Sequence, residues 1–248
     1  LVLVPTRELA MQVSEAVHRY GRGLRVEVLP IYGGQPIGRQ LQVLRRGVDV
    51  VVATPGRAID HINRGSLDLQ HIDVVVLDEA DEMLDMGFAE DIDWIFEQTP
   101  AARQVALFSA TMPTAIRRVA HAHLHDAVEV RLLAATETVD TIDQYHCLVT
   151  RFHKLDVLTR VLEVETFDAM LIFVRTKIQT LEVAEKLSAH GFSAEPLNGD
   201  MTQSERERTV ERLKRGRLDI LVATDVAARG IDITDVSHVI NYECPDSE

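Results

Sequence analysis

The sequence predicts an α/β protein of two domains, each with a mostly parallel β-sheet flanked by helices. Three observations predict this fold class. Short runs rich in β-branched residues alternate with longer amphipathic segments along the 248 residues. The runs at 48–53 and 72–77 are almost continuously apolar, which fits strands covered on both faces. The alternation stops after residue 132 and then restarts, which indicates a second domain.

The first predicted domain spans residues 1–132. Runs of Val, Ile and Leu predict its strands, because branched side chains pack well on a pleated surface. Apolar residues three and four positions apart predict its helices. The strands are expected at 1–4, 26–31, 48–53, 72–77, 104–108 and 127–132, and the helices at 7–19, 36–46, 87–98 and 113–122.

Residues 133–141 are small and polar without apolar periodicity, which predicts a short linker. The second predicted domain follows at 142–248. Its strands are expected at 143–149, 169–174, 192–197, 218–223 and 236–241, and its helices at 153–164, 177–190 and 202–215.

The two halves also resemble each other. Residues 33–57 and 198–230 both contain a Gly turn, a helix ending in Arg-Gly, a strand, and then Val-Ala-Thr. Any two βα units share some of this pattern, but a tandem duplication explains it better. Ligands of open parallel sheets bind at the carboxyl ends of the strands, so we expect the two domains to face a common cleft.

The net charge of −13 argues against binding nucleic acid through an overall positive field, so any such binding must be local. Of 26 basic residues only four are Lys, which leaves 22 Arg. Arg suits phosphate oxygens, although an Arg-rich surface also serves solvation. No apolar run approaches the roughly 18 residues of a membrane helix, and Cys147 and Cys244 form no CxxC pair. A cytoplasmic protein without a membrane partner is expected.

The segment 74–84, VVVLDEADEML, runs from apolar residues directly into carboxylates. Crowded carboxylates repel one another unless they share a cation, which points to a divalent metal. Asp78 falls at the carboxyl end of a buried strand, where an aspartate holds Mg²⁺ on a nucleotide. Glu79 is placed to orient or deprotonate water. The alternative is an acidic helix start, with Asp78 as the N-cap.

Ser109-Ala110-Thr111 follows another predicted buried strand. Hydroxyl groups there are placed to bond the carboxylate of Asp81 on the adjacent strand. Alternatively, Thr111 is the N-cap of the helix that begins near Pro113.

Two segments place a hydroxyl, a helix start and an arginine after a strand: Pro5-Thr6-Arg7 and Thr54-Pro55-Gly56-Arg57. Free N–H groups and the helix dipole at such starts favour binding of successive phosphates. Thr54 as the N-cap with Pro55 at the first helical position is an equally good structural explanation.

In the second half, residues 224–232 combine a hydroxyl, acids and an arginine after a strand. Arg229 is placed to reach a nucleotide phosphate and Asp232 to accept from a ribose hydroxyl. Gly230 as a helix stop is the structural alternative.

Taken in this order, these segments resemble the DEAD-box family of ATP-dependent RNA helicases, which have two RecA-like domains. The resemblance implies ATP and Mg²⁺ as cofactors and RNA, bound without sequence preference, as partner. It implies that Asp78 and Glu79 bind Mg²⁺ and position water, and that Asp81, Ser109 and Thr111 couple ATP hydrolysis to work on RNA. Nucleotide-facing residues would be Asp78, Glu79, Arg229, Gly230 and Asp232. RNA-facing residues would be Pro5, Thr6, Arg7, Gly34, Thr54, Pro55, Gly56, Arg57, Thr176, Gly199, Gln203, Arg206, Thr224 and Asp225.

Three departures from the family pattern modify this expectation. No GxxxxGK[ST] loop for ATP phosphates occurs, the upstream glutamine motif is missing, and the chain ends at residues 245–248 before an HRxGRxxR segment. We therefore expect a fragment that is catalytically incompetent, from a parent that hydrolyses ATP with RNA stimulation and locally unwinds short duplexes. A non-catalytic RNA-binding scaffold, or a helicase that translocates on DNA, are the alternatives.

Overall fold

The computed structural model describes residues 1–132, 142–228, 231 and 236–243. The chain divides into two compact units, Leu1–Val128 (unit 1) and Glu129–Glu248 (unit 2). The expected linker at 133–141 lies outside the described residues, so the expected domain limits remain a prediction.

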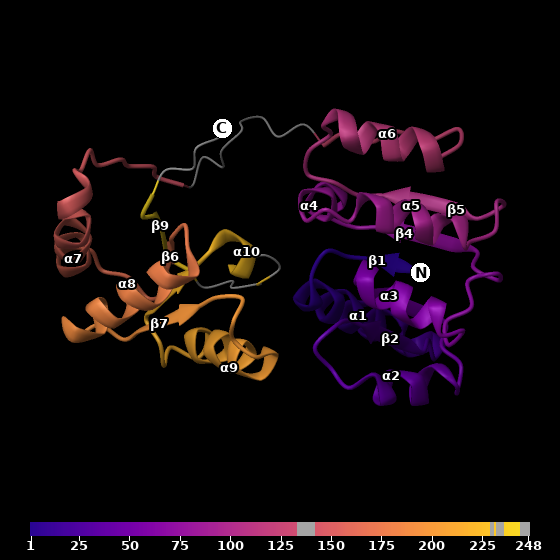
Figure 1. The fold of residues 1–248 in the computed structure, drawn as a ribbon, viewed down its shortest axis with the longest axis horizontal. Coiled ribbons are helices and arrows are strands. Elements are labelled where there is room, and N and C mark those ends of the chain that lie inside the picture. The colour runs from indigo at the N-terminus through magenta and orange to yellow at the C-terminus, as the bar shows by residue number, and fades with distance from the viewer. Residues whose placement is uncertain (133–141, 229–230, 232–235, 244–248) are drawn as a thin grey trace. The chain divides into compact units, whose positions relative to one another are not determined.

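Unit 1 contains a five-stranded parallel sheet in the order β2-β3-β1-β4-β5 (Figure 1). Leu3 of β1 pairs with Ala53 of β3 and with Leu77 of β4, so the carboxyl ends of these strands are level. The strands are β1 (Val2–Leu3), β2 (Val28–Ile31), β3 (Val50–Ala53), β4 (Val74–Leu77) and β5 (Gln104–Leu107).

Helices cover both faces of this sheet, as the continuous apolar runs predicted. In β3, Val51 and Ala53 face a large core shared with α3 to α6, while Val52 faces a smaller core beside α1. The helical segments are α1 (Arg7–Gly21), the 3-10 turn η1 (Arg22–Leu24), α2 (Ile37–Leu44), α3 (Pro55–Asn63), α4 (Ala80–Asp85), α5 (Ala89–Glu97) and α6 (Thr114–His123).

Unit 2 contains a four-stranded parallel sheet in the order β7-β8-β6-β9. Its central strand β8 is buried at every position, with apolar cores on both sides. The strands are β6 (Met170–Phe173), β7 (Ala194–Leu197), β8 (Ile220–Ala223) and β9 (His238–Asn241). The helical segments are η2 (Arg151–His153), α7 (Lys154–Val164), α8 (Lys177–Ala189), α9 (Gln203–Lys214) and α10 (Asp225–Ala228).

Two expected strands, 127–132 and 143–149, do not form. The alternation of Val128, Val130 and Leu132 resembles a strand, but these side chains are 88%, 79% and 94% exposed. A β-branched run becomes a strand only where a sheet edge pairs with it and a core covers one face, and neither is present at these described residues.

The strand orders of the two units match over four positions. β2-β3-β1-β4 corresponds to β7-β8-β6-β9, with every pair parallel. The shared connectivity supports the interpretation of the two halves as copies of one unit.

Candidate functional site

The acidic segment of unit 1 leaves β4 through a strained turn. Asp78 N–H donates to the carbonyl of Leu3 at 3.0 Å, which extends the sheet one residue beyond β4. Glu79 then adopts a left-handed conformation with φ 51° and ψ 52°. This conformation costs a non-glycine residue about 1–3 kcal/mol, and such strain is found mostly at functional sites. The turn lets α4 begin at once at Ala80, whose N–H donates to Phe108 O.

Asp78 is not the N-cap of α4, so that alternative is wrong. The N-cap position belongs to Glu79, whose side chain makes no capping hydrogen bond. Asp78 Oδ1 instead accepts the N–H of Glu79 at 3.0 Å. Asp78 therefore lies at the strand end, before the helix.

Asp81 links the exits of β4 and β5, as the sequence predicted. Its Oδ2 accepts both the hydroxyl of Thr111 at 2.7 Å and the N–H of Thr111 at 2.8 Å. Asp81 N–H donates to Ser109 Oγ, which itself donates to the carbonyl of Thr111. Burial alone would raise the pKa of Asp81, but the hydrogen bonds from Thr111 and Ser109 outweigh it and lower that pKa.

Thr111 is consequently not the N-cap of the following helix. That helix, α6, begins at Thr114 with Pro113 in the N-cap position. The hydroxyl of Thr111 is committed to Asp81 instead.

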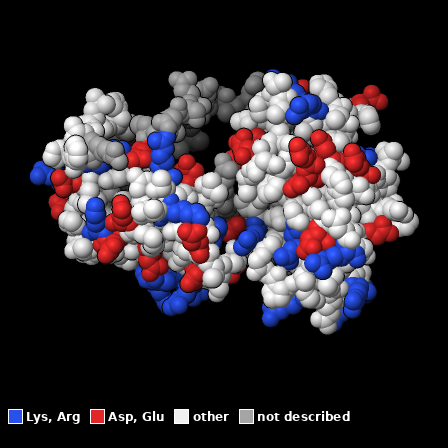
Figure 2. All heavy atoms as spheres, viewed as in Figure 1, with Lys and Arg blue, Asp and Glu red and all other residues white. Residues whose placement is uncertain are grey.

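The pKa of Glu79 shifts in the opposite direction to that of Asp81. Burial raises its pKa, and repulsion from Asp78, Glu82 and Asp81 raises it further. Residues 78–97 contain nine acidic residues and no Lys or Arg. Figure 2 shows acidic side chains gathered where α4 and α5 lie, and basic ones gathered towards α2 and α3. The segment therefore has no cationic side chain of its own to neutralise its negative charge.

The oxygen ligands of this turn suit Mg²⁺, which proteins often hold with one or two carboxylates while water and phosphate complete the octahedron. Among the described residues, no group of three or more His, Cys, Asp or Glu is arranged to hold a metal on its own. Asp78 and Glu79 supply two carboxylates, which is the number that proteins often contribute to a Mg²⁺ ion held together with phosphate.

The predicted RNA-facing residues of unit 1 lie after β1, β2 and β3. Thr6 caps α1, with its hydroxyl accepting the N–H of Leu9 at 3.2 Å. Gly34 has φ +84°, and a Cβ there would lie 2.6 Å from Arg7 Nη1. A side chain at position 34 would therefore be strained by the positive φ and would displace the Arg7 guanidinium.

The second such segment, 54–57, starts α3. Thr54 occupies the N-cap without a side-chain hydrogen bond, Pro55 is the first helical residue, and Gly56 is exposed. Arg57 Nη1 donates to Gln35 O at 3.3 Å and to Gln40 Oε1 at 2.9 Å. Ile31 of β2 and Leu3 of β1 both pair with Ala53 of β3, so the carboxyl ends of these three strands are level. The residues that follow the strands therefore lie at the same end of the sheet.

Sequence reasoning missed two residues behind Arg57. Gln40 and His61 are 3% and 0% exposed, and His61 Nε2 lies 3.0 Å from Gln40 Oε1. Each is a polar residue on the apolar side of a helix: Gln40 is three positions from Ile37 and four from Leu44. That pattern was the available signal.

In unit 2, the predicted RNA-facing residues lie near the carboxyl ends of the sheet strands. Thr176 is the N-cap of α8 and forms a capping box with Gln179. Gly199 lies against the side chain of Lys177. Arg206 Nη2 donates to the carbonyl of Ala227 at 3.0 Å, which joins α9 to α10.

The other predicted residues of unit 2 follow the same edge. Gln203 begins α9, and its amide donates to Glu207 Oε1 at 3.0 Å. Thr224 follows β8 and accepts the N–H of Ala227, and Asp225 begins α10. Arg229, Gly230 and Asp232 lie outside the described residues, so their roles and the shared cleft remain predictions.

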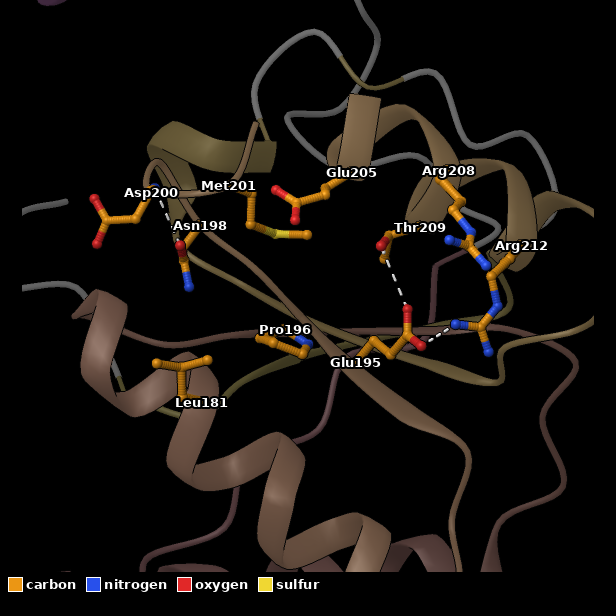
Figure 3. A pocket seen from close by; sticks show the side chains of 10 residues that line it. All are labelled: Leu181, Glu195, Pro196, Asn198, Asp200, Met201, Glu205, Arg208, Thr209 and Arg212. Carbon is orange, nitrogen blue, oxygen red and sulfur yellow. Dashed lines mark hydrogen bonds and ion pairs between the residues drawn. The ribbon is translucent and has the colours of Figure 1, made fainter. Parts of the chain in front are cut away.

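A groove of about 720 Å³ lies between α8, β7 and α9 (Figure 3). It contains none of the predicted site residues. Glu195 on its floor is already engaged by Thr209 and Arg212. The candidate site therefore remains at the carboxyl ends of the strands.

Comparison with known proteins identifies the family. Residues 1–119 match the family model described as DEAD/DEAH box helicase, and residues 153–248 match that of the helicase conserved C-terminal domain. The chain belongs to the DEAD-box helicase family. Within the described residues, no helix is long and apolar enough to cross a membrane.

Two curated relatives and one solved structure illustrate the similarity. The chain is 58% identical to the ATP-dependent RNA helicase DeaD of Mycobacterium tuberculosis, over 99% of this chain and 43% of that protein. It is 54% identical to DeaD of Escherichia coli, over 100% and 40%. It matches the structure of Saccharomyces cerevisiae Dbp5 bound to RNA and ADP BeF3 with a TM-score of 0.84 and 33% identity, over 98% and 62%. The chain thus spans less than half the length of these two curated relatives, and its units have the RecA-like fold.

The environment of His61 predicts a pH-dependent stability. Burial lowers the pKa of His61 from its ordinary 6.5, and the nearby Arg57 and Arg64 lower it further while Asp60 opposes them. His61 of the unfolded chain takes up a proton near pH 6.5, and in the folded chain it does so only at a lower pH. The free energy of unfolding should therefore fall as the pH drops below about 6.5.

Urea unfolding at pH 7.5 and pH 5.5, followed by fluorescence of Trp94, the only Trp in the chain, checks this in unit 1. His61→Gln should reduce the difference between the two pH values, and His71→Gln, which alters an exposed histidine, should not. An unchanged difference in His61→Gln would contradict the assignment.

Proposed function

We propose that this chain forms the core of an ATP-dependent RNA helicase, which hydrolyses ATP when RNA is bound and locally separates short RNA duplexes. The observation that carries the proposal is the turn from Asp78 to Asp81. It places the carboxylates of Asp78 and Glu79 at a strand end, and the bond from Asp81 to Thr111 joins the turn to the segment after the next strand. The relatives named ATP-dependent RNA helicases support it.

On the nucleotide side, Asp78 is the residue that would hold Mg²⁺ at the end of β4, with Glu79 beside it. When bound there, Mg²⁺ would supply positive charge to neutralise the charge that develops on the transferred phosphoryl group. Glu79 orients the attacking water and accepts its proton. Burial and its acidic neighbours raise the pKa of Glu79, which makes it a stronger base than an ordinary carboxylate. Arg229, Gly230 and Asp232 would contact the nucleotide from unit 2.

Asp81 acts differently, because its Oδ2 accepts two hydrogen bonds from Thr111 and its N–H donates to Ser109. It is suited to transmit movement of the turn to the segment after β5. We propose that this link couples hydrolysis to RNA remodelling.

On the RNA side, helix starts and arginines grip the phosphate backbone. In unit 1 these are Pro5, Thr6, Arg7, Gly34, Thr54, Pro55, Gly56 and Arg57. In unit 2 they are Thr176, Gly199, Gln203, Arg206, Thr224 and Asp225. Such groups carry no base-reading pattern, so the affinity is expected to be independent of sequence. The structural likeness to Dbp5 bound to RNA supports this assignment.

A non-catalytic RNA-binding scaffold is the second candidate. The raised pKa of Glu79 argues for the enzyme, because a scaffold has no need of a strained turn with a destabilised carboxylate. ATP turnover by the full-length protein separates the two.

Glu79→Gln in the full-length protein should reduce ATP turnover by about two to four orders of magnitude, because the amide cannot accept a proton. Binding of Mg²⁺-ATP should change little, since the shape is kept. Single-turnover hydrolysis and equilibrium binding measure the two effects. Glu90→Gln, an exposed acid at the start of α5, is the matched control. Near-normal turnover in Glu79→Gln would show that Glu79 is not the base.

Arg57→Ala and Arg206→Ala should weaken RNA binding by a similar factor for unrelated single strands, because each removes a backbone contact. The slope of log affinity against log salt should become smaller by about one for each. Fluorescence anisotropy with two RNAs of different sequence measures both quantities. Arg64→Ala, an exposed arginine one residue beyond the end of α3, is the control. A loss of affinity for only one of the two RNA sequences would contradict binding through the RNA phosphate backbone.

The isolated 248-residue chain should show no ATPase activity, with or without RNA. Its sequence contains no GxxxxGK[ST] loop, so the carboxylates lack the lysine and backbone N–H groups that hold a triphosphate. Titration calorimetry with a non-hydrolysable ATP analogue tests this, with the full-length protein as control. Micromolar binding to the isolated chain would refute it.

A further inference from the structure

Arg57 is supported from behind by a line of buried polar groups on α2 and α3. Gln40 projects from α2 and contacts three partners. Its Nε2 donates to the carbonyl of Tyr32 at 3.1 Å, and its Oε1 lies 2.9 Å from Arg57 Nη1 and 3.0 Å from His61 Nε2. His61 continues the line, with Nδ1 2.8 Å from Ser66 Oγ. The line reaches from the core of unit 1 to the guanidinium.

The chemistry of these contacts fixes the orientation of the Gln40 amide. The carbonyl of Tyr32 can only accept, so it must face the NH₂ group. The guanidinium of Arg57 can only donate, so it must face the oxygen. A flipped amide would place two acceptors together at Tyr32 and two donors together at Arg57.

The fixed amide in turn fixes the tautomer of His61. Since Gln40 Oε1 is an acceptor, His61 Nε2 must carry a proton. The lowered pKa keeps the ring neutral, so Nδ1 is unprotonated. The single hydroxyl proton of Ser66 then has two acceptors within reach, Nδ1 at 2.8 Å and the carbonyl oxygen of His61 at 2.9 Å. Both lone pairs of Gln40 Oε1 are then used, one by His61 and one by Arg57.

The result is a guanidinium held on one side and open on the other. Nη1 of Arg57 is bound to Gln40 Oε1 and Gln35 O. Its Nε lies 3.8 Å from Asp60, and Nη2 has no partner within the part of the chain that the structure describes. The side chain is 15% exposed. The guanidinium of Arg57 is therefore already oriented before a phosphate binds to its Nη2 side.

We propose that Gln40 and His61 are positioning residues that orient Arg57 for RNA phosphate. This inference rests on the proposed function, because it assumes that Arg57 contacts RNA. It extends that function, because it proposes that Gln40 and His61 hold Arg57 in place for RNA without contacting the RNA themselves. Packing alone does not call for them, since an apolar residue at position 40 would match Ile37 and Leu44 and leave fewer polar groups to satisfy.

A double-mutant cycle in the 248-residue chain tests the proposal. Gln40→Met, Arg57→Ala and the double variant are compared for affinity to a single-stranded RNA by fluorescence anisotropy. Gln40→Met should weaken binding about threefold to tenfold in the wild-type background, as expected for one hydrogen bond to a charged group. In the Arg57→Ala background it should have no effect, because Gln40 acts only through Arg57. Gln42→Met, an exposed position on the same helix, is the matched control.

Substitutions of His61 supply the conservative rescue. His61→Leu removes the donor to Gln40 Oε1 and should weaken RNA binding. His61→Gln can still donate from its amide and should retain most of the affinity. Nitrogen-15 shifts of the wild-type His61 ring provide a readout that needs no variant to fold: Nε2 should be protonated and Nδ1 not.

The outcomes distinguish this inference from the proposed function. If Arg57→Ala binds RNA as tightly as wild type, the RNA role of Arg57 and the inference both fail. If Arg57→Ala weakens binding while Gln40→Met either has no effect or acts equally in both backgrounds, the inference alone is overturned. The opposite tautomer of His61 also overturns it.

Discussion

The parallel register of β4 against β5 is the constraint on which the chemistry of unit 1 depends. Leu77 pairs with Leu107, so the chain leaves both strands at the same level and Asp81 meets Thr111. A slip of one residue would turn every side chain of the strand to the opposite face and separate these groups. The same strand also pairs with β1, which places Asp78 level with the start of the segment that carries Arg7.

Burial of apolar side chains sets this register, and the register brings the polar groups at the strand ends within hydrogen-bonding distance of one another. Leu3, Leu77 and Ile31 are completely buried, so the alternation of faces in the sheet is strongly specified. The strained conformation of Glu79 is stable because Ala80 is anchored to Phe108 immediately after it. The core thus supports a turn that would be unfavourable in an isolated peptide.

The sequence allowed prediction of the features that depend on local pattern. Continuous apolar runs predicted the strands on either side of the acidic turn, and the order of carboxylate and hydroxyl predicted the bond between Asp81 and Thr111. The runs at 127–132 and 143–149 failed, because local pattern does not reveal whether a partner strand exists. Gln40 and His61 were missed for a related reason. Gln40 lies on α2 and His61 on α3, so their hydrogen bond depends on how the two helices pack, which the local sequence pattern does not reveal.

The matching strand orders of the two units also allow equivalent positions to be compared. By position in the sheets, the residues after β9, Tyr242 and Glu243, correspond to Asp78 and Glu79 after β4. Glu243 lies 3.6 Å from Lys154 Nζ, whose ammonium also lies over the ring of Tyr242. Its charge is therefore balanced within the chain, whereas that of Glu79 is not. A lysine thus compensates the acid at the end of β9, whereas the acid at the end of β4 has no ion pair of this kind within the described residues and is left to bind a cation from outside the chain.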